Sequence, residues 1–296
     1  MVDGMRMYYA EHGTPDGPPL VLLHGFTGTG DFWSQQLAAF GAHYRLLVPD
    51  LRGHGRTDNP GGAAAMNHRQ FAHDIIALCS VLGLERAAFC GESTGAMLQL
   101  SLALYAPDLA AACILAGATY YFSDESRAIQ RQVTPDTMDE VGRAYVQKIH
   151  TALGPDHWRS VLEAFHALHT HAHTEDFPEE EELRGIGVPV LIIHGDRDEF
   201  FPVEVPAGLY RLLPDAELCL LPNTGHLPPQ ERPDWFNAIA LDFLARRYVG
   251  NAAGLSLNQV ASNGAIFMDW HAAPETYSRT LSGEAVAPCR CSRRSR

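Results

Sequence analysis

Three residues of this chain have the types and surroundings that nucleophilic catalysis requires. Ser93 is the centre of GESTG (91–95), a G-x-S-x-G sequence, while His226 ends NTGH and Asp198 ends HGDRD. A serine hydroxyl is a weak nucleophile at neutral pH and needs a base within hydrogen-bond reach. A histidine can be that base, and a carboxylate on its other ring nitrogen sets its tautomer and stabilises the imidazolium. The residues predict a serine hydrolase with Ser93 as nucleophile and His226 as general base.

The residues around Ser93 predict a sharp turn between a strand and a helix. RAAFCGE (86–92) is a mostly apolar run typical of a buried strand, and a helix is expected from Ala96 to about Tyr105. In such a turn the serine sits at a strained elbow, and glycines two positions to either side let the backbone pack tightly. Glu92, beside the nucleophile, is interpreted as a residue that shapes the elbow rather than as a second base.

His226 and the acidic residues also follow predicted strands. VPVLIIHG (188–195) precedes Asp196 and Asp198, and AELCLLP (216–222) precedes His226. Side chains that follow parallel strands gather at the carboxyl edge of the sheet, where α/β folds build their sites. The pattern leaves both aspartates open as the third residue. The order Ser, Asp, His along the chain differs from the two protease orders and is the one expected of a sheet with this elbow.

The alternation of apolar and helix-like segments predicts a mostly parallel sheet covered by helices. Residues 31–42 have helical spacing with Asp31 as N-cap. Residues 120–185 interrupt the alternation: they are polar and helix-rich, with a helix expected to start at Thr134 and Pro135, and they are too long for a loop in a compact domain. The remaining strand-like runs are PLVLLHG (19–25), YRLLVPD (44–50) and AACILAG (111–117).

The expected organisation is a core of residues 1–119 plus 186–249, with residues 120–185 as a helical cap over the carboxyl edge of the sheet. Residues 250–296 lack sustained periodicity and are rich in Ala, Ser and Gly. We expect this tail to be disordered or a non-native extension.

Separate blocks between about residue 5 and residue 249 resemble the α/β-hydrolase superfamily. The blocks are LLHGFTG (22–28), DLRGHGRTD (50–58), GESTG, HGDRDEFFP and NTGHLPPQERP. The resemblance implies an α/β-hydrolase fold and makes Asp198 the catalytic acid, with Asp196 shaping the turn. It also implies that the backbone N–H groups of Phe26 and Thr94 form the oxyanion hole, where one donor typically contributes ~10²–10³ in rate. Arg52 and His54 of the second block are expected to be structural.

Several other residues are weaker candidates for the site. Seven aromatic residues could line an apolar acyl pocket below the cap, and equally most of them could belong to the core: Phe26, Trp33, Tyr120, Tyr121, Phe122, Trp158 and Phe165. No metal is expected, because the histidines between positions 166 and 173 lack a companion carboxylate pattern such as H-E-x-x-H. Cys289 and Cys291 supply too few ligands for a structural zinc ion. No cofactor is signalled.

Composition excludes some partners. The formal net charge of −13 disfavours nucleic acid, which requires a basic face. The sequence contains no run of about 18 apolar residues, so no membrane span is predicted. The first residues lack the features of a secretory signal. The six cysteines have no framework spacing, so we expect free thiols and a cytoplasmic location.

The expected reaction is hydrolysis of a small to medium carboxylic ester or lactone through an acyl-enzyme, with that small molecule as the partner. The resemblance also admits a carbon–carbon bond hydrolase or a cofactor-free perhydrolase on the same triad. A ligand receptor that has lost turnover is the alternative of another class. A dehalogenase or epoxide hydrolase is disfavoured, because the resemblance would then require Asp at position 93.

Overall fold

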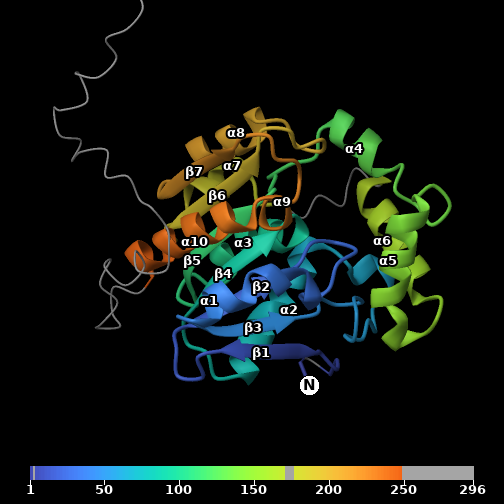
Figure 1. The fold of residues 1–296 in the computed structure, drawn as a ribbon, viewed down its shortest axis with the longest axis horizontal. Helices are drawn as coiled ribbons and strands as arrows, with labels where there is room; N and C mark the ends of the chain where they lie inside the picture. The colour runs from blue at the N-terminus through green and yellow to red at the C-terminus, as the bar shows by residue number, and fades with distance from the viewer. Residues whose placement is uncertain (3, 171–176, 249–296) are drawn as a thin grey trace, which may run out of the picture. The chain divides into compact units, whose positions relative to one another are not determined.

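The computed structural model describes residues 1, 2, 4–170 and 177–248, so the predicted tail lies outside the described residues. Within them, seven strands form one sheet in the order β1-β3-β2-β4-β5-β6-β7 (Figure 1). All neighbouring strands are parallel except β1 and β3, which are antiparallel. The strands are β1 (Tyr9–Gly13), β2 (Pro19–Leu23), β3 (Arg45–Pro49), β4 (Ala87–Glu92), β5 (Ala110–Ala116), β6 (Val190–Gly195) and β7 (Ala216–Leu221).

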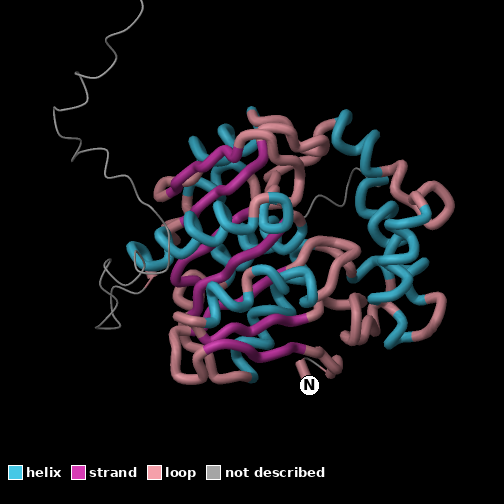
Figure 2. Tube along the Cα trace, in the orientation of Figure 1, coloured by secondary structure: helices cyan, strands magenta, loops and turns pink. Residues whose placement is uncertain are grey.

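Helices cover both faces of this sheet, as the alternating sequence pattern predicts (Figure 2). One face packs against α2 (His68–Val81), α3 (Thr94–Tyr105) and α8 (Glu204–Leu212). The other packs against η1 (Gly30–Gln35), α1 (Leu37–Gly41) and α10 (Pro233–Arg247). The remaining short elements are η2 (Ala63–Ala65) and α9 (Pro228–Glu231). The predicted α/β-hydrolase fold is confirmed.

Alternate residues of each central strand enter different cores. In β2, Val21 and Leu23 belong to the cluster that contains α2 and α3, whereas Leu20 and Leu22 belong to the cluster that contains α1 and α10. Successive side chains of a strand point to opposite faces, so a strand that is covered on both sides must be apolar throughout. This requirement explains the uninterrupted apolar runs in the sequence.

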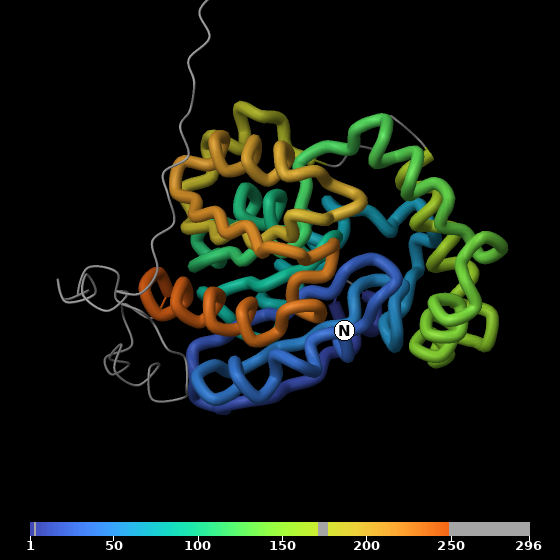
Figure 3. Tube along the Cα trace, turned by 45° about the horizontal axis from the view of Figure 1, so that its top comes forward, coloured from blue at the N-terminus to red at the C-terminus, as the bar shows by residue number. Residues whose placement is uncertain are grey.

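Among residues 117–170 and 177–189, which the structure describes between β5 and β6, there are five helices, in the segment predicted to be helical. They are α4 (Asp124–Gln130), α5 (Glu140–Ile149), η3 (Thr151–Leu153), α6 (His157–Thr170) and α7 (Glu180–Arg184). Figure 3 shows the green part of this insertion to one side of the sheet. The division of the chain into a core and a cap stays a prediction.

Two predicted helix starts are wrong. Residues 31–42 form a 3₁₀ helix followed by the short α1, and Thr29, not Asp31, is the N-cap. Thr134 does not begin a helix, because its hydroxyl and backbone pair with Thr137 in a turn. The helix begins at Glu140 instead, where the Asp139 carboxylate accepts the N–H of Gly142 and satisfies one free donor of the first turn. Within the described residues, no helix is both long and apolar enough to cross a membrane.

Candidate active site

The backbone at Ser93 forms the predicted elbow between β4 and α3. Ser93 has φ 50° and ψ −117°, a conformation that a residue with a Cβ rarely adopts. A Cβ on Gly91 would lie 2.1 Å from the carbonyl oxygen of Gly95, and a Cβ on Gly95 would lie 2.0 Å from that of Leu23. Both glycines are therefore required by close backbone contacts rather than by flexibility.

The elbow brings Ser93 to His226, which lies 133 positions later in the chain. The Ser93 Oγ and the His226 Nε2 are 3.0 Å apart, and the His226 Nδ1 is 2.8 Å from the Asp198 Oδ2. A carboxylate only accepts hydrogen bonds, so Nδ1 carries the proton and Nε2 is free to accept one from Ser93. The structure thus brings together the three side chains singled out from the sequence, in the geometry of nucleophile, base and orienting acid.

Asp198 is held by groups on its own loop. Its Oδ1 accepts the backbone N–H groups of Phe200 and Phe201 at 2.8 and 3.1 Å. Burial opposes ionisation of this carboxyl, but the hydrogen bond from His226, the charges of His226 and His194 and the Phe200 N–H together lower its pKa. Asp196, the other candidate acid, instead accepts the N–H of Thr224 at 3.3 Å.

The surroundings of His226 favour its protonated form. Burial lowers the pKa of an imidazole, but the Asp198 hydrogen bond and charge, with the charges of Glu92 and Glu199, raise the pKa of His226 above its usual value of 6.5. Phe200 and Phe201 pack edge-on against the imidazole, with ring centroids 4.7 and 5.5 Å away. This apolar packing keeps the ring between the serine and the acid.

The two proposed oxyanion donors belong to different segments, the start of α3 and the loop after β2. Thr94 is the first residue of α3, so its N–H has no acceptor within the helix. Phe26 lines the same cavity as Ser93, in the loop after β2. His24 shapes this loop: its Nδ1 donates to the Gly25 carbonyl at 2.8 Å, and its Nε2 accepts the Leu51 N–H at 2.9 Å. Both ring nitrogens of His24 therefore have hydrogen-bond partners within the protein.

The DLRGHG block has structural contacts, in keeping with its expected role. Asp50 is fully buried and accepts the N–H groups of Gly30 and Arg56 at 2.9 and 3.0 Å. Arg52 forms a buried two-bond ion pair with Asp74 of α2. These contacts tie the turn to the loop after β2 and to α2, and so hold the rim of the sheet near Ser93.

A cavity of about 220 Å³ opens at Ser93. Its walls come from the loops that carry the three site residues and from the insertion between β5 and β6. The lining residues are Phe26, Thr27, Glu92, Ser93, Gln130, Val133, Phe165, Glu199, Phe200, His226 and Leu227. Phe200 lies in the HGDRDEFFP block, close to Asp198, and Leu227 directly follows His226. Their positions in the sequence could therefore have identified them as cavity residues.

Of the aromatic residues predicted for the pocket, Phe26 and Phe165 line this cavity, whereas Trp33, Tyr120, Tyr121, Phe122 and Trp158 do not, which corrects that part of the prediction. Trp33 is fully buried on the other face of the sheet, against Phe236. Trp158 packs inside the insertion in a separate apolar cluster. Tyr120 packs partly buried against the core, and Tyr121 is exposed beside it. Aromatic side chains bury large apolar areas, so most find a place in a core.

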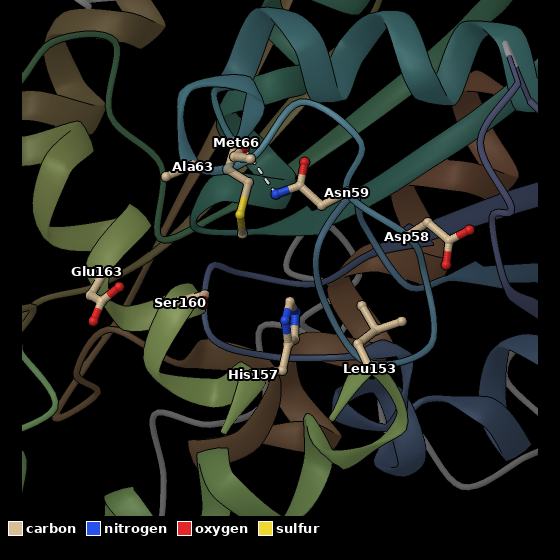
Figure 4. A pocket seen from close by; sticks show the side chains of 9 residues that line it. Asp58, Asn59, Ala63, Met66, Leu153, His157, Ser160 and Glu163 are labelled. Atoms are coloured by element: carbon tan, nitrogen blue, oxygen red, sulfur yellow. Dashed lines mark hydrogen bonds between the residues drawn. The ribbon is translucent and has the colours of Figure 1, made fainter. Parts of the chain in front are cut away.

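A larger cavity of about 440 Å³ lies elsewhere, between residues 58–66 and the insertion (Figure 4). Its walls include His157 and Asn59. The His157 Nε2 donates to the Gly53 carbonyl at 2.7 Å, and the Asn59 side-chain amide donates a hydrogen bond to the Gly62 carbonyl. Neither Ser93 nor His226 lines it. Volume alone does not identify a catalytic site, and it is the smaller cavity that Ser93 and His226 line.

The histidines of the insertion are engaged in backbone contacts. The Nδ1 of His166 donates to the carbonyl of Arg131, and that of His169 donates to the carbonyl of Phe165. His171 and His173 lie outside the described residues. Among the described residues, no group of three potential ligands is placed to hold a metal ion.

Comparison with known proteins agrees with the fold. The model of the family described as "Alpha/beta hydrolase family" matches residues 20–239. The chain is 30% identical over 268 residues to a "Putative carbamate hydrolase RutD" of Caulobacter sp. (strain K31), covering 82% of this chain and 97% of that protein. The enol-lactonase from Burkholderia xenovorans LB400 superimposes with a TM-score of 0.67 at 24% identity, over 82% of this chain and 98% of its own. Est816, described as an N-acyl homoserine lactone degrading enzyme, superimposes with a TM-score of 0.66 at 25% identity. The match covers 81% of this chain and 98% of Est816.

Proposed function

The chain belongs to the alpha/beta hydrolase family, and from this premise we propose that it hydrolyses carboxylic esters or lactones of small to medium size. The observation that carries the proposal is the 3.0 Å approach of the Ser93 Oγ to the His226 Nε2, with Asp198 bonded to the opposite ring nitrogen. This arrangement is suited to making an alkoxide-like nucleophile at neutral pH.

The proposed reaction has two halves. His226 takes the proton of Ser93 as its Oγ attacks the carbonyl carbon, and the N–H groups of Phe26 and Thr94 hold the oxyanion. His226 then gives this proton to the leaving alkoxide, which departs and leaves an acyl group on Ser93. A water molecule, deprotonated by His226, attacks the acyl carbonyl and releases the acid. Asp198 stays ionised throughout and stabilises the imidazolium.

The size of the cavity supports a small substrate. Ligand cavities that bury drug-sized molecules are typically ~300–1,000 Å³, and the cavity at Ser93, about 220 Å³, lies below that range. Its wall combines aromatic rings with Gln130 and two carboxyl groups, so a short acyl chain with a polar group suits it. The printed descriptions of Est816 and the enol-lactonase concern lactones, which supports including cyclic esters among the substrates.

A carbamate is the second candidate substrate. The Caulobacter relative described as a putative carbamate hydrolase matches almost its full length at 30% identity. A carbamate carbonyl accepts the same serine attack and the same oxyanion donors, so the change of substrate requires no change in the roles of the three residues.

A substrate panel tests the proposal directly. The wild type and Ser93→Ala are incubated with p-nitrophenyl esters of increasing chain length, simple lactones, an aryl carbamate and a β-diketone. We expect the short esters and lactones to be cleaved by the wild type and not by Ser93→Ala. If esters of every length stay intact while the β-diketone is cleaved, the protein is a carbon–carbon bond hydrolase and the proposal is wrong.

Labelling with a fluorophosphonate separates an enzyme from a receptor. The reagent forms a covalent bond with an activated serine, so the wild type should be labelled at residue 93 and Ser93→Ala should not. Absence of labelling in both proteins, with tight binding of a small ligand, would identify a receptor.

A cytoplasmic location is also proposed. Cys79, Cys90, Cys113 and Cys219 are free thiols, and the first three are buried among apolar side chains. Burial raises the pKa of the Cys79 and Cys113 thiols to about 12, which keeps them protonated and inert. Such thiols are typical of proteins in a reducing compartment.

A further inference from the structure

A buried carboxyl group adjoins the proposed nucleophile. Glu92 ends β4, the central strand of the sheet, and its side chain is almost completely buried at 3% exposure. Buried carboxyl groups cost free energy unless both oxygens are paired with hydrogen-bond donors or a cation. The packing of Glu92 therefore needs an explanation beyond the shape of the elbow.

The two oxygens of Glu92 have different surroundings. One lies against Gly25, where an added Cβ would come within 2.2 Å of Oε2, and the Gly25 N–H donates to the carboxyl group. Oε1 has no hydrogen-bond partner among the described residues and lies 3.5 Å from the His226 Nε2. Leaving a buried polar atom unpaired typically costs ~1–3 kcal/mol, and more when it is charged.

The free oxygen and the serine face the same atom. The His226 Nε2 lies 3.0 Å from the Ser93 Oγ and 3.5 Å from the Glu92 Oε1, and all three residues line one cavity. An imidazolium at this place has carboxyl groups on both sides, Asp198 at Nδ1 and Glu92 at Nε2. A proton on Nε2 can therefore be stabilised without any contact to substrate.

We propose that Glu92 is a positioning residue that shares one proton with His226 and thereby sets the pH range in which His226 can accept the proton of Ser93. With the proton on Nε2 and Glu92 ionised, His226 cannot act as a base. With the proton on the Glu92 carboxyl, or lost to water, Nε2 is free to accept the serine proton. The inference rests on the proposed roles of Ser93 and His226.

The charged groups around the pair are consistent with a shared proton. Burial raises the pKa of Glu92 to about 7, against the opposing effects of His226 and the Gly25 N–H, with a further rise from the Asp198 charge. Against the opposing effect of burial, the Asp198 hydrogen bond and the charges of Asp198, Glu92 and Glu199 raise the pKa of His226 as well. Interacting groups of this kind lose protons in steps that belong to the pair.

Other titratable groups lie on the elements that neighbour the pair. Strand β6 contributes His194, and the loop after it contributes Asp198 and Glu199. The loop after β2 contributes His24, which accepts the Leu51 N–H at Nε2 and is held in its neutral form. The partner of Glu92 on β5 is Ala116, which cannot titrate. Glu92 is the group among them that has a free oxygen directed at Nε2.

The test measures protonation without turnover. Histidine side chains labelled with ¹⁵N are titrated by NMR in the wild type and in Glu92→Gln, with His226→Asn identifying the signal. Glu92→Gln keeps the shape and the Gly25 contact but removes the charge. We expect His226 to titrate at a pH lower by roughly one unit in the variant, as loss of a carboxylate within ~4–6 Å predicts.

Glu199→Gln is the matched control, because Glu199 lines the same cavity but its carboxylate is exposed and screened by water. Glu199→Gln should shift the pH at which His226 titrates clearly less than Glu92→Gln does. Glu92→Met, of similar volume, provides a second measurement if Glu92→Gln does not fold. An unchanged His226 titration in a folded Glu92 variant, or an equal shift in Glu199→Gln, overturns the inference.

Ester hydrolysis measured on the same samples separates the two proposals. If the NMR shift appears, the acid limb of kcat/KM for p-nitrophenyl acetate should move to lower pH by the same amount. If the shift appears but no sample cleaves any ester, the proposed function fails while the shared proton stands. If esters are cleaved with an unchanged acid limb and an unchanged His226 signal, only the Glu92 inference fails.

Discussion

Gly117 leaves the space in which the imidazole of His226 lies. A Cβ on Gly117 would lie 3.3 Å from both Cε1 and Nδ1 of the ring and 2.7 Å from the His226 carbonyl oxygen. Gly117 follows β5 with φ +56°, and its N–H donates to the Ile193 carbonyl of β6. The base is thus positioned from behind by a strand that contributes no catalytic side chain.

Gly117→Ala should reduce activity strongly. The added methyl group pushes the imidazole and its loop away from Ser93, and misplacement of a catalytic group by about 1 Å can cost ~10²-fold in rate. The positive φ adds strain of about 1–2 kcal/mol. We expect kcat to fall by about two orders of magnitude, measured with the best ester of the panel.

Gly83→Ala provides the matched control for that experiment. Gly83 also has a positive φ, +66°, but a Cβ there meets nothing within 4 Å. Thermal unfolding should show a loss of stability in both variants from the positive φ, larger in Gly117→Ala because its Cβ also collides with the His226 carbonyl, while kcat of Gly83→Ala stays near the wild-type value. A large loss of kcat in Gly83→Ala would show that backbone strain, not contact with His226, explains the first result.

Asp198→Asn should be far more damaging than Asp196→Asn. An amide at position 198 can donate to Nδ1 and so favours the wrong tautomer of His226, a change that typically lowers kcat ~10⁴-fold in serine triads. The Asp196 carboxylate accepts only one long bond from Thr224, so its amide variant should lose less than about tenfold. Steady-state kinetics of both variants compare the two acids directly, and equal losses would contradict the choice of Asp198.

Asp74→Asn should destabilise the fold. Asp74 is 1% exposed and binds the Arg52 guanidinium through two bonds, so its loss leaves a buried positive charge without its partner. Breaking one side of a buried pair typically costs ~3–5 kcal/mol, and urea unfolding measures this change. Asp58→Asn breaks the exposed pair with Arg6 and should cost at most about 1 kcal/mol. Similar losses in the two variants would refute the structural importance of the buried pair.

Buried histidines should make the protein sensitive to acid. Burial lowers the pKa of His150 to about 4 and that of His68 to about 3, so the folded protein leaves both neutral at pH 5. The unfolded chain binds these protons below about pH 6.5, so stability falls as the pH drops from 6.5 toward 4.

His150→Gln removes one of these groups. From the pKa difference we expect His150 alone to account for about 2 kcal/mol of the stability lost between pH 7 and pH 5. Urea unfolding of the wild type and the variant at both pH values measures the difference. If the two proteins lose the same stability on acidification, His150 is not kept neutral by the fold.

The sequence by itself determined the fold class and indicated Ser93 and His226 of the candidate site, while the resemblance chose Asp198 over Asp196. The elbow at Ser93 is local: a buried strand, a turn that admits no Cβ at Gly91 or Gly95, and a helix must follow one another within a few residues. His226 and Asp198 follow buried strands of the same sheet, and parallel strands present their carboxyl ends at one edge. Short-range patterns of this kind are legible without coordinates.

The tertiary structure alone decided which residues surround those three. Among the aromatic candidates, Trp33 and Trp158 fill two separate cores, while Phe165 reaches the cavity together with Gln130 of the insertion, and the sequence pattern did not separate these outcomes. The environment of Glu92 was equally hidden, because its burial and its distance to His226 depend on loops far away in the chain. The surroundings of a side chain are set by packing between segments that are distant in the chain. The spacing of residues along the sequence does not show which face of one segment packs against which face of another.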